Sequence, residues 1–224
     1  MNHTERTIIV AGGELDRQSL LEIYQEDDLL LAADAGVLSL LEIGLIPDIA
    51  IGDFDTTGKE SFSKWQELGI HIQVLSPEKN ETDTHAALEY AIRQGAKEVA
   101  LFGTLGGARF DHAIANVQLL EWCLEKGVKV VIYHPHNRLR LIQGPENVEI
   151  AKTSYQYLSL LPISKDVRGI HTRGLSYPLH NGHLMRGYTL GISNEWAEPI
   201  ATISIQEGIC LICESDDGKN VSLF

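Results

Sequence analysis

Residues 29–55 read LLLAADAGVLSLLEIGLIPDIAIGDFD, an apolar run, a segment of helical periodicity and a second apolar run. The runs at residues 29–33 and 48–51 are short and rich in Leu, Ala and Ile, which is typical of strands buried on both faces of a parallel sheet. Residues 37–43 repeat apolar side chains at helical spacing. Because parallel neighbouring strands need a crossover between them, this order predicts a βαβ unit.

The same alternation of apolar runs and helical segments extends over the N-terminal part of the chain. The other strand candidates are residues 7–11, 71–75, 98–102 and 129–133, and the other helix candidates are residues 18–25, 59–68, 83–94 and 110–126. Strands that alternate with helices in this way form βαβ units and a parallel sheet. We therefore predict that residues 1–135 form an α/β domain with a Rossmann-like, mostly parallel sheet.

The pattern changes after His134, where helical periodicity gives way to short apolar runs divided by turn signals. The strand candidates are residues 140–143, 148–151, 156–161, 169–172, 183–187, 201–206 and 209–214. Asn181-Gly182 is typical of a two-residue hairpin turn. Many short strands without intervening helices predict an all-β sandwich domain over residues 136–224.

Composition narrows the possible partners. The hydrophobic content of 44% and charged content of 22% are ordinary for a globular protein. The formal net charge of −13 argues against binding to nucleic acid, which requires a basic face. No apolar run approaches the ~20 residues that cross a bilayer, and the N-terminus lacks the pattern of a signal peptide. We expect a cytoplasmic protein with neither nucleic-acid nor membrane partners.

Carboxylates recur where the predicted parallel strands end. Asp34 follows the strand at 29–33, Asp53 and Asp55 follow the strand at 48–51, and Asp83 opens a predicted helix. In a doubly wound sheet, ligands bind beyond the carboxyl ends of the strands. Clustered carboxylates repel one another. A magnesium ion removes this repulsion and leaves coordination positions for phosphate oxygens, so we expect a magnesium–phosphate site.

A glycine-rich run lies at another strand end. Residues 103–108 read GTLGGA and lead into Arg109 and a predicted helix. Backbone N–H groups at a helix N-terminus bind phosphate, and an arginine stabilises a phosphoryl group in transfer. Each feature alone is also typical of a cap or a turn, so the prediction rests on their combination. The sequence lacks GxxxxGK[ST], which excludes a P-loop enzyme.

Four motifs in order resemble one enzyme family. They are PDIAIGDFDT at residues 47–56, KNETD at 79–83, GARFDH at 107–112 and ISNE at 192–195. The chain is similar to thiamine pyrophosphokinases of the bacterial type over nearly its whole length. The resemblance implies an α/β nucleotide domain and a C-terminal β-sandwich. It also implies magnesium-dependent transfer of diphosphate from ATP to thiamine, giving thiamine diphosphate and AMP, by a homodimer with thiamine bound between its subunits.

The resemblance also implies roles for individual residues. The magnesium-facing carboxylates are expected to be Asp34, Asp53, Asp55 and Asp83. The residues implied in catalysis are Asp53, Asp55, Asp83 and Arg109, and those implied in nucleotide binding are Asp34, Thr82, Arg109, Asp111 and His112. Those implied near thiamine are Ser193 and Asn194, with Tyr177 and Trp196 as aromatic candidates. The chain departs from the family pattern at Asn80, where Asp is common, and at Ala35, where Gly is common.

Other interpretations stay open at this level. The same metal–ATP site can serve another alcohol, such as a pterin, or a nucleotide-sensing module without turnover. The general base is not identified, although an aspartate such as Asp83 is a candidate. His112 can contact substrate or make a structural hydrogen bond, and Trp196 can stack on a cationic thiazolium ring or pack at a dimer interface.

Overall fold

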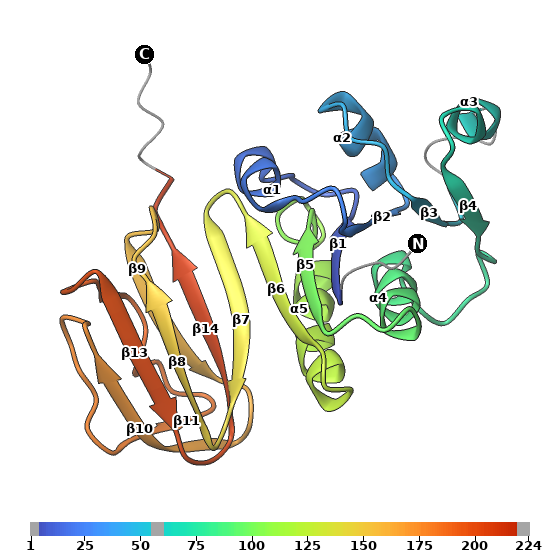
Figure 1. The fold of residues 1–224 in the computed structure, drawn as a ribbon. Helices are drawn as coiled ribbons and strands as arrows, with labels where there is room; N and C mark the ends of the chain where they lie inside the picture. The colour runs from blue at the N-terminus through green and yellow to red at the C-terminus, as the bar shows by residue number, and fades with distance from the viewer. Residues whose placement is uncertain (1–4, 55–60, 219–224) are drawn as a thin grey trace. The chain divides into compact units, whose positions relative to one another are not determined.

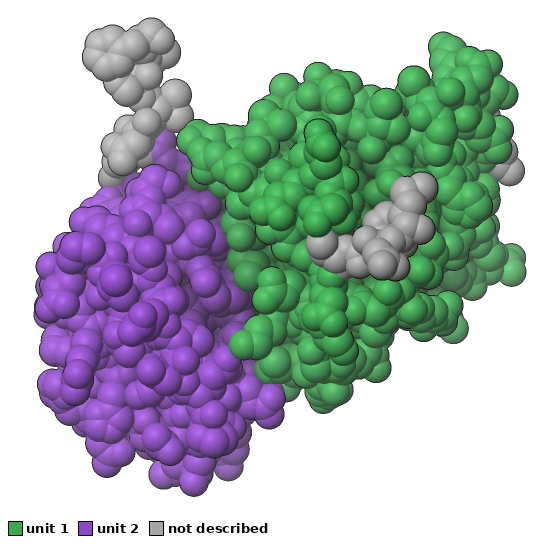
Figure 2. Space-filling model, in the orientation of Figure 1, with its two compact units in different colours: residues 1–135 green, residues 136–224 purple. Residues whose placement is uncertain are grey.

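The protein has two compact units, residues 1–135 and residues 136–224, which are coloured separately in Figure 2. The computed structural model describes residues 5–54 and 61–218. The division falls where the helical periodicity of the sequence ends. Each unit has its own hydrophobic core.

Unit 1 contains a parallel sheet of six strands (Figure 1). The strands are β1 (Arg6–Val10), β2 (Leu29–Ala33), β3 (Ile49–Gly52), β4 (His71–Val74), β5 (Glu98–Phe102) and β6 (Lys129–His134). Their order across the sheet is β6-β5-β1-β2-β3-β4, and every neighbouring pair is parallel. The chain order reverses at β1 and β5, and such a switch point is where open α/β sheets bind ligands.

Helices cover both faces of this sheet. They are α1 (Arg17–Ile23), α2 (Gly36–Glu42), α3 (Phe62–Glu67), α4 (Asp83–Arg93) and α5 (Phe110–Glu125). Leu20 of α1, Leu40 of α2 and Trp65 of α3 share one core with alternate strand residues such as Ile8 and Leu30. Helix α4 packs on β1, β2 and β3 with other side chains. Because strand side chains alternate between faces, burial on both faces explains the continuous apolar runs.

Unit 2 is a sandwich of two antiparallel sheets, as expected. Its strands are β7 (Asn137–Gln143), β8 (Glu146–Ala151), β9 (Tyr157–Pro162), β10 (Asp166–Arg173), β11 (Gly182–Met185), β12 (Asn194–Glu195), β13 (Ile200–Ile205) and β14 (Ile209–Ser215). One sheet has the order β12-β9-β14-β7 and the other β11-β10-β13-β8. Ile142, Leu158 and Ile212 of the first sheet and Val167 and Ile203 of the second belong to one core.

The predicted two-residue hairpin at Asn181-Gly182 is wrong. Residues 174–181 separate β10 from β11, so the connection is a longer loop. Thr172 fixes this loop, because its hydroxyl accepts a hydrogen bond from the Leu179 N–H at 2.8 Å. Asn181 does adopt the positive φ of 53° that its residue type favours. The dipeptide therefore ends the loop instead of forming it.

None of the helices described here has the length and apolarity needed to span a membrane.

Candidate functional site

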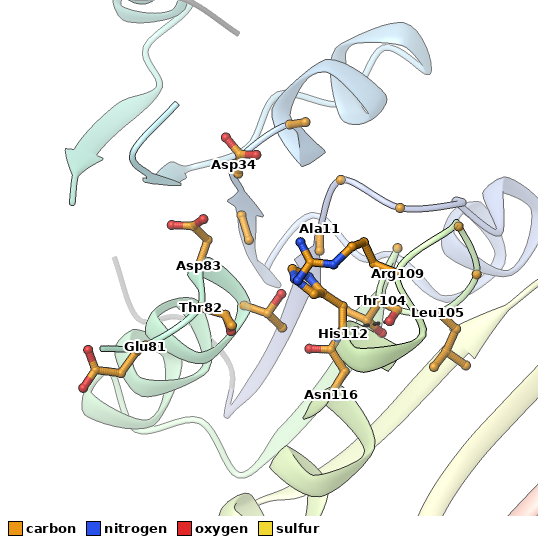
Figure 3. A pocket seen from close by; sticks show the side chains of 18 of the residues that line it. Ala11, Asp34, Glu81, Thr82, Asp83, Thr104, Leu105, Arg109, His112 and Asn116 are labelled. Carbon is orange, nitrogen blue, oxygen red and sulfur yellow. Dashed lines mark hydrogen bonds between the residues drawn. The ribbon is translucent and has the colours of Figure 1, made fainter. Parts of the chain in front are cut away.

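A pocket of ≈ 590 Å³ lies at the carboxyl ends of the parallel strands of unit 1 (Figure 3). Its wall comes from the segments that follow β1, β2, β3 and β5 and from the loop that leads into α4. In Figure 3, Asp34 and Asp83 project from the β2 and α4 side, and Arg109 and His112 from the α5 side. Of the residues predicted to line the site, Asp34, Asp53, Asp83 and Arg109 therefore meet at one pocket.

The loops after β1 and β5 touch through glycine backbone. The Gly13 N–H donates to the Gly103 carbonyl at 2.8 Å. A Cβ on Gly103 would lie 2.3 Å from the Ala11 carbonyl oxygen, and one on Gly13 would lie 2.5 Å from the Gly103 carbonyl oxygen. Side chains at either position would force the loops apart. The glycines thus leave backbone exposed to the pocket at the switch point of the sheet.

Asp34 enters the pocket from a strained backbone. Its φ is +47°, a region that residues with a Cβ seldom occupy. The Asp34 N–H donates to the Ile51 carbonyl at 2.9 Å, and Gly52 lets the two chains approach, since a Cβ there would lie 3.1 Å from the Asp34 Cα. The sheet therefore holds Asp34 in this conformation, and such held strain is typical of functional sites.

Asp53 and Asp83 share one lysine that the sequence analysis did not assign. The Lys79 Nζ lies 3.1 Å from Asp53 Oδ2 and 2.9 Å from Asp83 Oδ1. The Lys79 side chain is 15% exposed. Burial lowers the pKa of Lys79, but the pull of Asp83 and Asp53 outweighs it and the net pKa is raised. Lys79 is therefore a cation inside the carboxylate cluster.

Thr82 is the N-cap residue of α4, and its side chain makes a hydrogen bond to the helix backbone. Its hydroxyl accepts a hydrogen bond from the His85 N–H at 3.2 Å, as an N-cap does. The next residue, Asp83, lies in the first helical turn, where the helix dipole stabilises a negative charge. The cap fixes the direction in which Asp83 enters the pocket.

Arg109 and Asp111 form an exposed pair at the start of α5. The Arg109 Nε donates to Asp111 Oδ1 at 2.9 Å. This bond lowers the pKa of Asp111 to about 2 and raises that of Arg109. Of the three predicted nucleotide ligands around the start of α5, Arg109 and His112 line the pocket, whereas Asp111 orients Arg109.

Asn116 is a second pocket residue that the sequence analysis missed. Its Nδ2 donates to the Thr104 carbonyl at 2.8 Å, in a buried position. Asn116 therefore ties the glycine-rich loop to α5. The signal was its position four residues after His112, because residues at this spacing share a helix face. Asn80, the departure from the family pattern, is exposed next to Lys79.

The donor chemistry of the pocket fits a magnesium ion. Asp34, Asp53 and Asp83 all line it, and carboxylate oxygens are the protein ligands that magnesium prefers. The fourth predicted ligand, Asp55, lies outside the described residues. Within the described residues, no three His, Cys, Asp or Glu side chains are close enough together to hold a metal. The predicted ligand set stays a prediction.

The residues predicted near thiamine gather in unit 2. The Asn194 Oδ1 accepts from the Tyr177 N–H at 3.0 Å, and its Nδ2 donates to the Tyr177 carbonyl at 2.7 Å. The Ser193 N–H donates to the Ser159 hydroxyl at 2.9 Å. Asn194 therefore fixes the Tyr177 segment, and the Tyr177 side chain is exposed.

The Trp196 side chain makes a hydrogen bond within unit 2. Its indole Nε1 donates to the Tyr155 carbonyl at 3.0 Å, and the ring packs, partly buried, against the core of unit 2. Packing within the unit is a role that neither of the two sequence-based interpretations included.

Comparison with known proteins gives consistent matches. The family model "Thiamin pyrophosphokinase, catalytic domain" matches residues 20–132, and "Thiamin pyrophosphokinase, vitamin B1 binding domain" matches residues 146–210. The thiamine pyrophosphokinase of Bacillus subtilis is 32% identical over 93% of this chain and 98% of its own. Its crystal structure superposes with a TM-score of 0.86, covering 95% of this chain and 99% of that one. The crystal structure of the thiamin pyrophosphokinase from Geobacillus thermodenitrificans is 34% identical in sequence. It superposes with a TM-score of 0.82 and covers 96% of this chain and 99% of that one.

Proposed function

The chain belongs to the thiamine pyrophosphokinase family, and we propose that it transfers a diphosphate group from ATP to the hydroxyl of thiamine, with magnesium. The observation that supports this most directly is the pocket in which glycine-rich backbone, carboxylates and Arg109 meet. It lies at the switch point of the sheet, where this fold class binds nucleotides. The products are thiamine diphosphate and AMP.

The glycine-rich side of the pocket is suited to phosphate. Gly106 and Gly107 have φ values of +82° and +75°. Residues other than glycine rarely adopt these conformations. They precede Arg109 and the N-terminus of α5, where N–H groups and the helix dipole favour an anion. Arg109, oriented by Asp111, supplies a positive charge whose five donors fit phosphate oxygens.

The carboxylate side is suited to a cation. One or two of the carboxylates Asp34, Asp53 and Asp83 would hold magnesium, together with water and phosphate oxygens. When bound, magnesium supplies positive charge that offsets the phosphate charge during transfer. Rigid placement of these carboxylates, by the sheet around Asp34 and by the cap before Asp83, keeps the pocket organised before substrates arrive.

The proposed transfer balances as a single displacement. The thiamine hydroxyl oxygen bonds to the β-phosphorus, and the bond from that phosphorus to the oxygen bridging to the α-phosphorus breaks. AMP leaves with that oxygen, and a pocket carboxylate or water accepts the hydroxyl proton. The residues contribute chiefly by positioning and by charge, as is general for phosphoryl transfer.

We assign thiamine binding to unit 2 and a homodimer as the working form. This rests on the family and on apolar side chains that unit 2 exposes, including Tyr188 at 68% and Leu190 at 61%. Exposed apolar side chains are typical of contact surfaces where they form a contiguous patch. Light scattering on the purified protein measures the oligomeric state directly, and a monomer at working concentration would rule out the dimer.

The decisive test of the activity is to incubate the protein with ATP, Mg²⁺ and thiamine and to separate the products. Equal amounts of AMP and thiamine diphosphate are expected. ADP with thiamine monophosphate would contradict the diphosphate transfer. AMP formed with a pterin alcohol but not with thiamine would change the acceptor, and ATP binding without AMP under any condition would indicate a sensor.

A further inference from the structure

Lys79 lies in a loop that the fold ties down at both ends. The Leu75 N–H donates to the Gly52 carbonyl at 2.8 Å, which places the start of the loop beside the strand end that bears Asp53. The Thr82 cap fixes its other end at α4. Between these points Lys79 extends into the pocket and meets both carboxylates. Its position is therefore set by the backbone around it.

The lysine ammonium contacts the two carboxylates unequally. Its contact with Asp53 Oδ2 is a hydrogen bond of 3.1 Å. Within the described residues, the contact with the buried Asp83 Oδ1 at 2.9 Å lacks the angle of a hydrogen bond. The ammonium is thus shared between two carboxylates that both line the pocket. The arrangement can accept a stronger cation.

An ammonium and a magnesium ion compete at these carboxylates, because two cations held so close together repel each other. Magnesium requires ligand oxygens at about 2.0–2.1 Å, whereas the ammonium occupies the space about 3 Å from both carboxylates. We propose that Lys79 is a stand-in cation, which neutralises Asp53 and Asp83 in the metal-free enzyme and leaves them when a divalent cation binds. This rests on the magnesium-dependent transfer proposed above.

The same pocket offers Lys79 a new partner after release. Lysine has a flexible four-carbon stem and a strongly hydrated point charge. Lys79 lines the pocket together with Gly106, Gly107 and Arg109, so its ammonium remains beside the place assigned to phosphate. The exchange would move one positive charge from the carboxylate side to the phosphate side as the metal arrives.

The first test is metal binding without nucleotide. Lys79→Met removes the charge and keeps most of the length of the side chain, and Lys97→Met is the matched control on an exposed lysine of the same unit. Titration with Mn²⁺ by calorimetry is expected to show binding at least about tenfold tighter in Lys79→Met than in wild type, because no cation must leave. Lys97→Met is expected to bind as wild type does. Equal or weaker binding in Lys79→Met, or no saturable binding in any of the three proteins, would overturn the inference.

The second test follows the lysine itself. Wild-type protein is treated briefly with an acetylating N-hydroxysuccinimide ester, with and without Mg²⁺, and acetylation is quantified at each lysine by mass spectrometry. Mg²⁺ is expected to raise acetylation of Lys79 several-fold and to leave Lys97 unchanged. Continued protection of Lys79 at saturating Mg²⁺ would mean that the ammonium stays in place.

These tests separate the two proposals. An enzyme that converts thiamine to thiamine diphosphate but keeps Lys79 protected with Mg²⁺ supports the proposed function and refutes the exchange. An enzyme that releases Lys79 but forms no AMP from any acceptor refutes the activity alone.

Discussion

Two clusters of ionised side chains, one in each unit, combine carboxylates and cations in different proportions. In unit 2 one carboxylate contacts two arginines, whereas in unit 1 two carboxylates contact one lysine. In unit 2, Glu214 of β14 is fully buried and binds two arginines of the neighbouring strand β7. Arg138 donates to both of its carboxylate oxygens, at 2.7 and 2.6 Å, and the Thr153 hydroxyl adds a bond of 3.1 Å. Glu214 and Arg138 are direct cross-strand partners, so the sheet register brings them together.

In unit 1 the proportion is reversed. Two carboxylates, Asp53 and Asp83, share Lys79, and the three side chains keep 19%, 23% and 15% of their surface exposed. A buried carboxylate whose oxygens already accept hydrogen bonds from several donors does not bind a further ligand. Carboxylates and a lysine that line a pocket remain within reach of a ligand, so the lysine can be exchanged for another cation. The first cluster therefore predicts an effect on stability, and the second an effect on ligand binding.

The largest stability effect is expected for Glu214→Gln. The substitution keeps the shape but leaves Arg138 and Arg140 without the charge that balances them. Removing one member of a buried ion pair costs about 3–5 kcal/mol, and the exposure of the arginines, 19% and 27%, places the expectation near 3 kcal/mol. Urea unfolding measures the change.

Glu149→Gln is the control, because Glu149 is exposed on β8 and its replacement should change the free energy of unfolding by under about 0.5 kcal/mol. A Glu214→Gln protein as stable as this control would mean that the arginines find water in place of the carboxylate. Catalysis in the folded fraction should be unchanged in both variants.

Asp53→Asn is expected to have the opposite effect, a loss of catalysis with little change in stability. We expect kcat to fall by about 10²–10³-fold, the range seen when one preorganised electrostatic contact at a transition state is removed. The fold should persist, because the amide oxygen still accepts a hydrogen bond from Lys79. Steady-state AMP formation and circular dichroism measure the two properties in parallel.

Asp27→Asn serves as the comparison variant, since Asp27 is exposed in unit 1. It should retain wild-type turnover. Wild-type turnover in Asp53→Asn as well would remove Asp53 from the catalytic site.

The sequence was informative wherever structure is periodic. Parallel strands end at one edge of a sheet, so the placement of Asp34 and Asp53 at one pocket followed from strand prediction, and that of Asp83 from the predicted helix that it opens. Lys79 could not be assigned in this way. Its role depends on the path of an irregular loop, and that path is set by the bond from Leu75 to Gly52, which no local pattern encodes.

Short stretches of sequence gave wrong or incomplete predictions where contacts between distant residues determine the conformation. Asn181-Gly182 has the composition of a tight hairpin, but the hydrogen bonds between Thr172 and Leu179 stabilise a longer loop. Trp196 was interpreted through its neighbours in sequence, whereas its indole bonds to Tyr155, 41 residues earlier. Partners this far apart become visible only when the sandwich is assembled.

A smaller effect is expected at the helix that presents Asp83. Thr82→Ala removes the cap of α4, which costs about 1 kcal/mol, whereas Thr82→Ser keeps an N-capping hydroxyl. Urea unfolding should therefore separate the two variants. If Thr82 also contacts the nucleotide, the KM for ATP will differ between Thr82→Ser and wild type at equal stability. Equal stability of the alanine and serine variants would show that the cap contributes nothing.

The smallest effect on stability belongs to the pair that is most exposed. Arg109 holds the pKa of Asp111 at about 2, below its usual 3.8, so the contribution of this pair is fully present above about pH 4 and is lost only as pH falls toward 2. The ¹³C carboxyl resonance of Asp111 should therefore stay constant from pH 7 to pH 3.5. In Arg109→Met it should begin to titrate near pH 4, and in the matched variant Arg93→Met, on α4, it should not. Titration of Asp111 near pH 4 in wild type would mean that Arg109 is not oriented by Asp111 in solution, and the phosphate side of the pocket would then lack the preorganisation that the carboxylate side has.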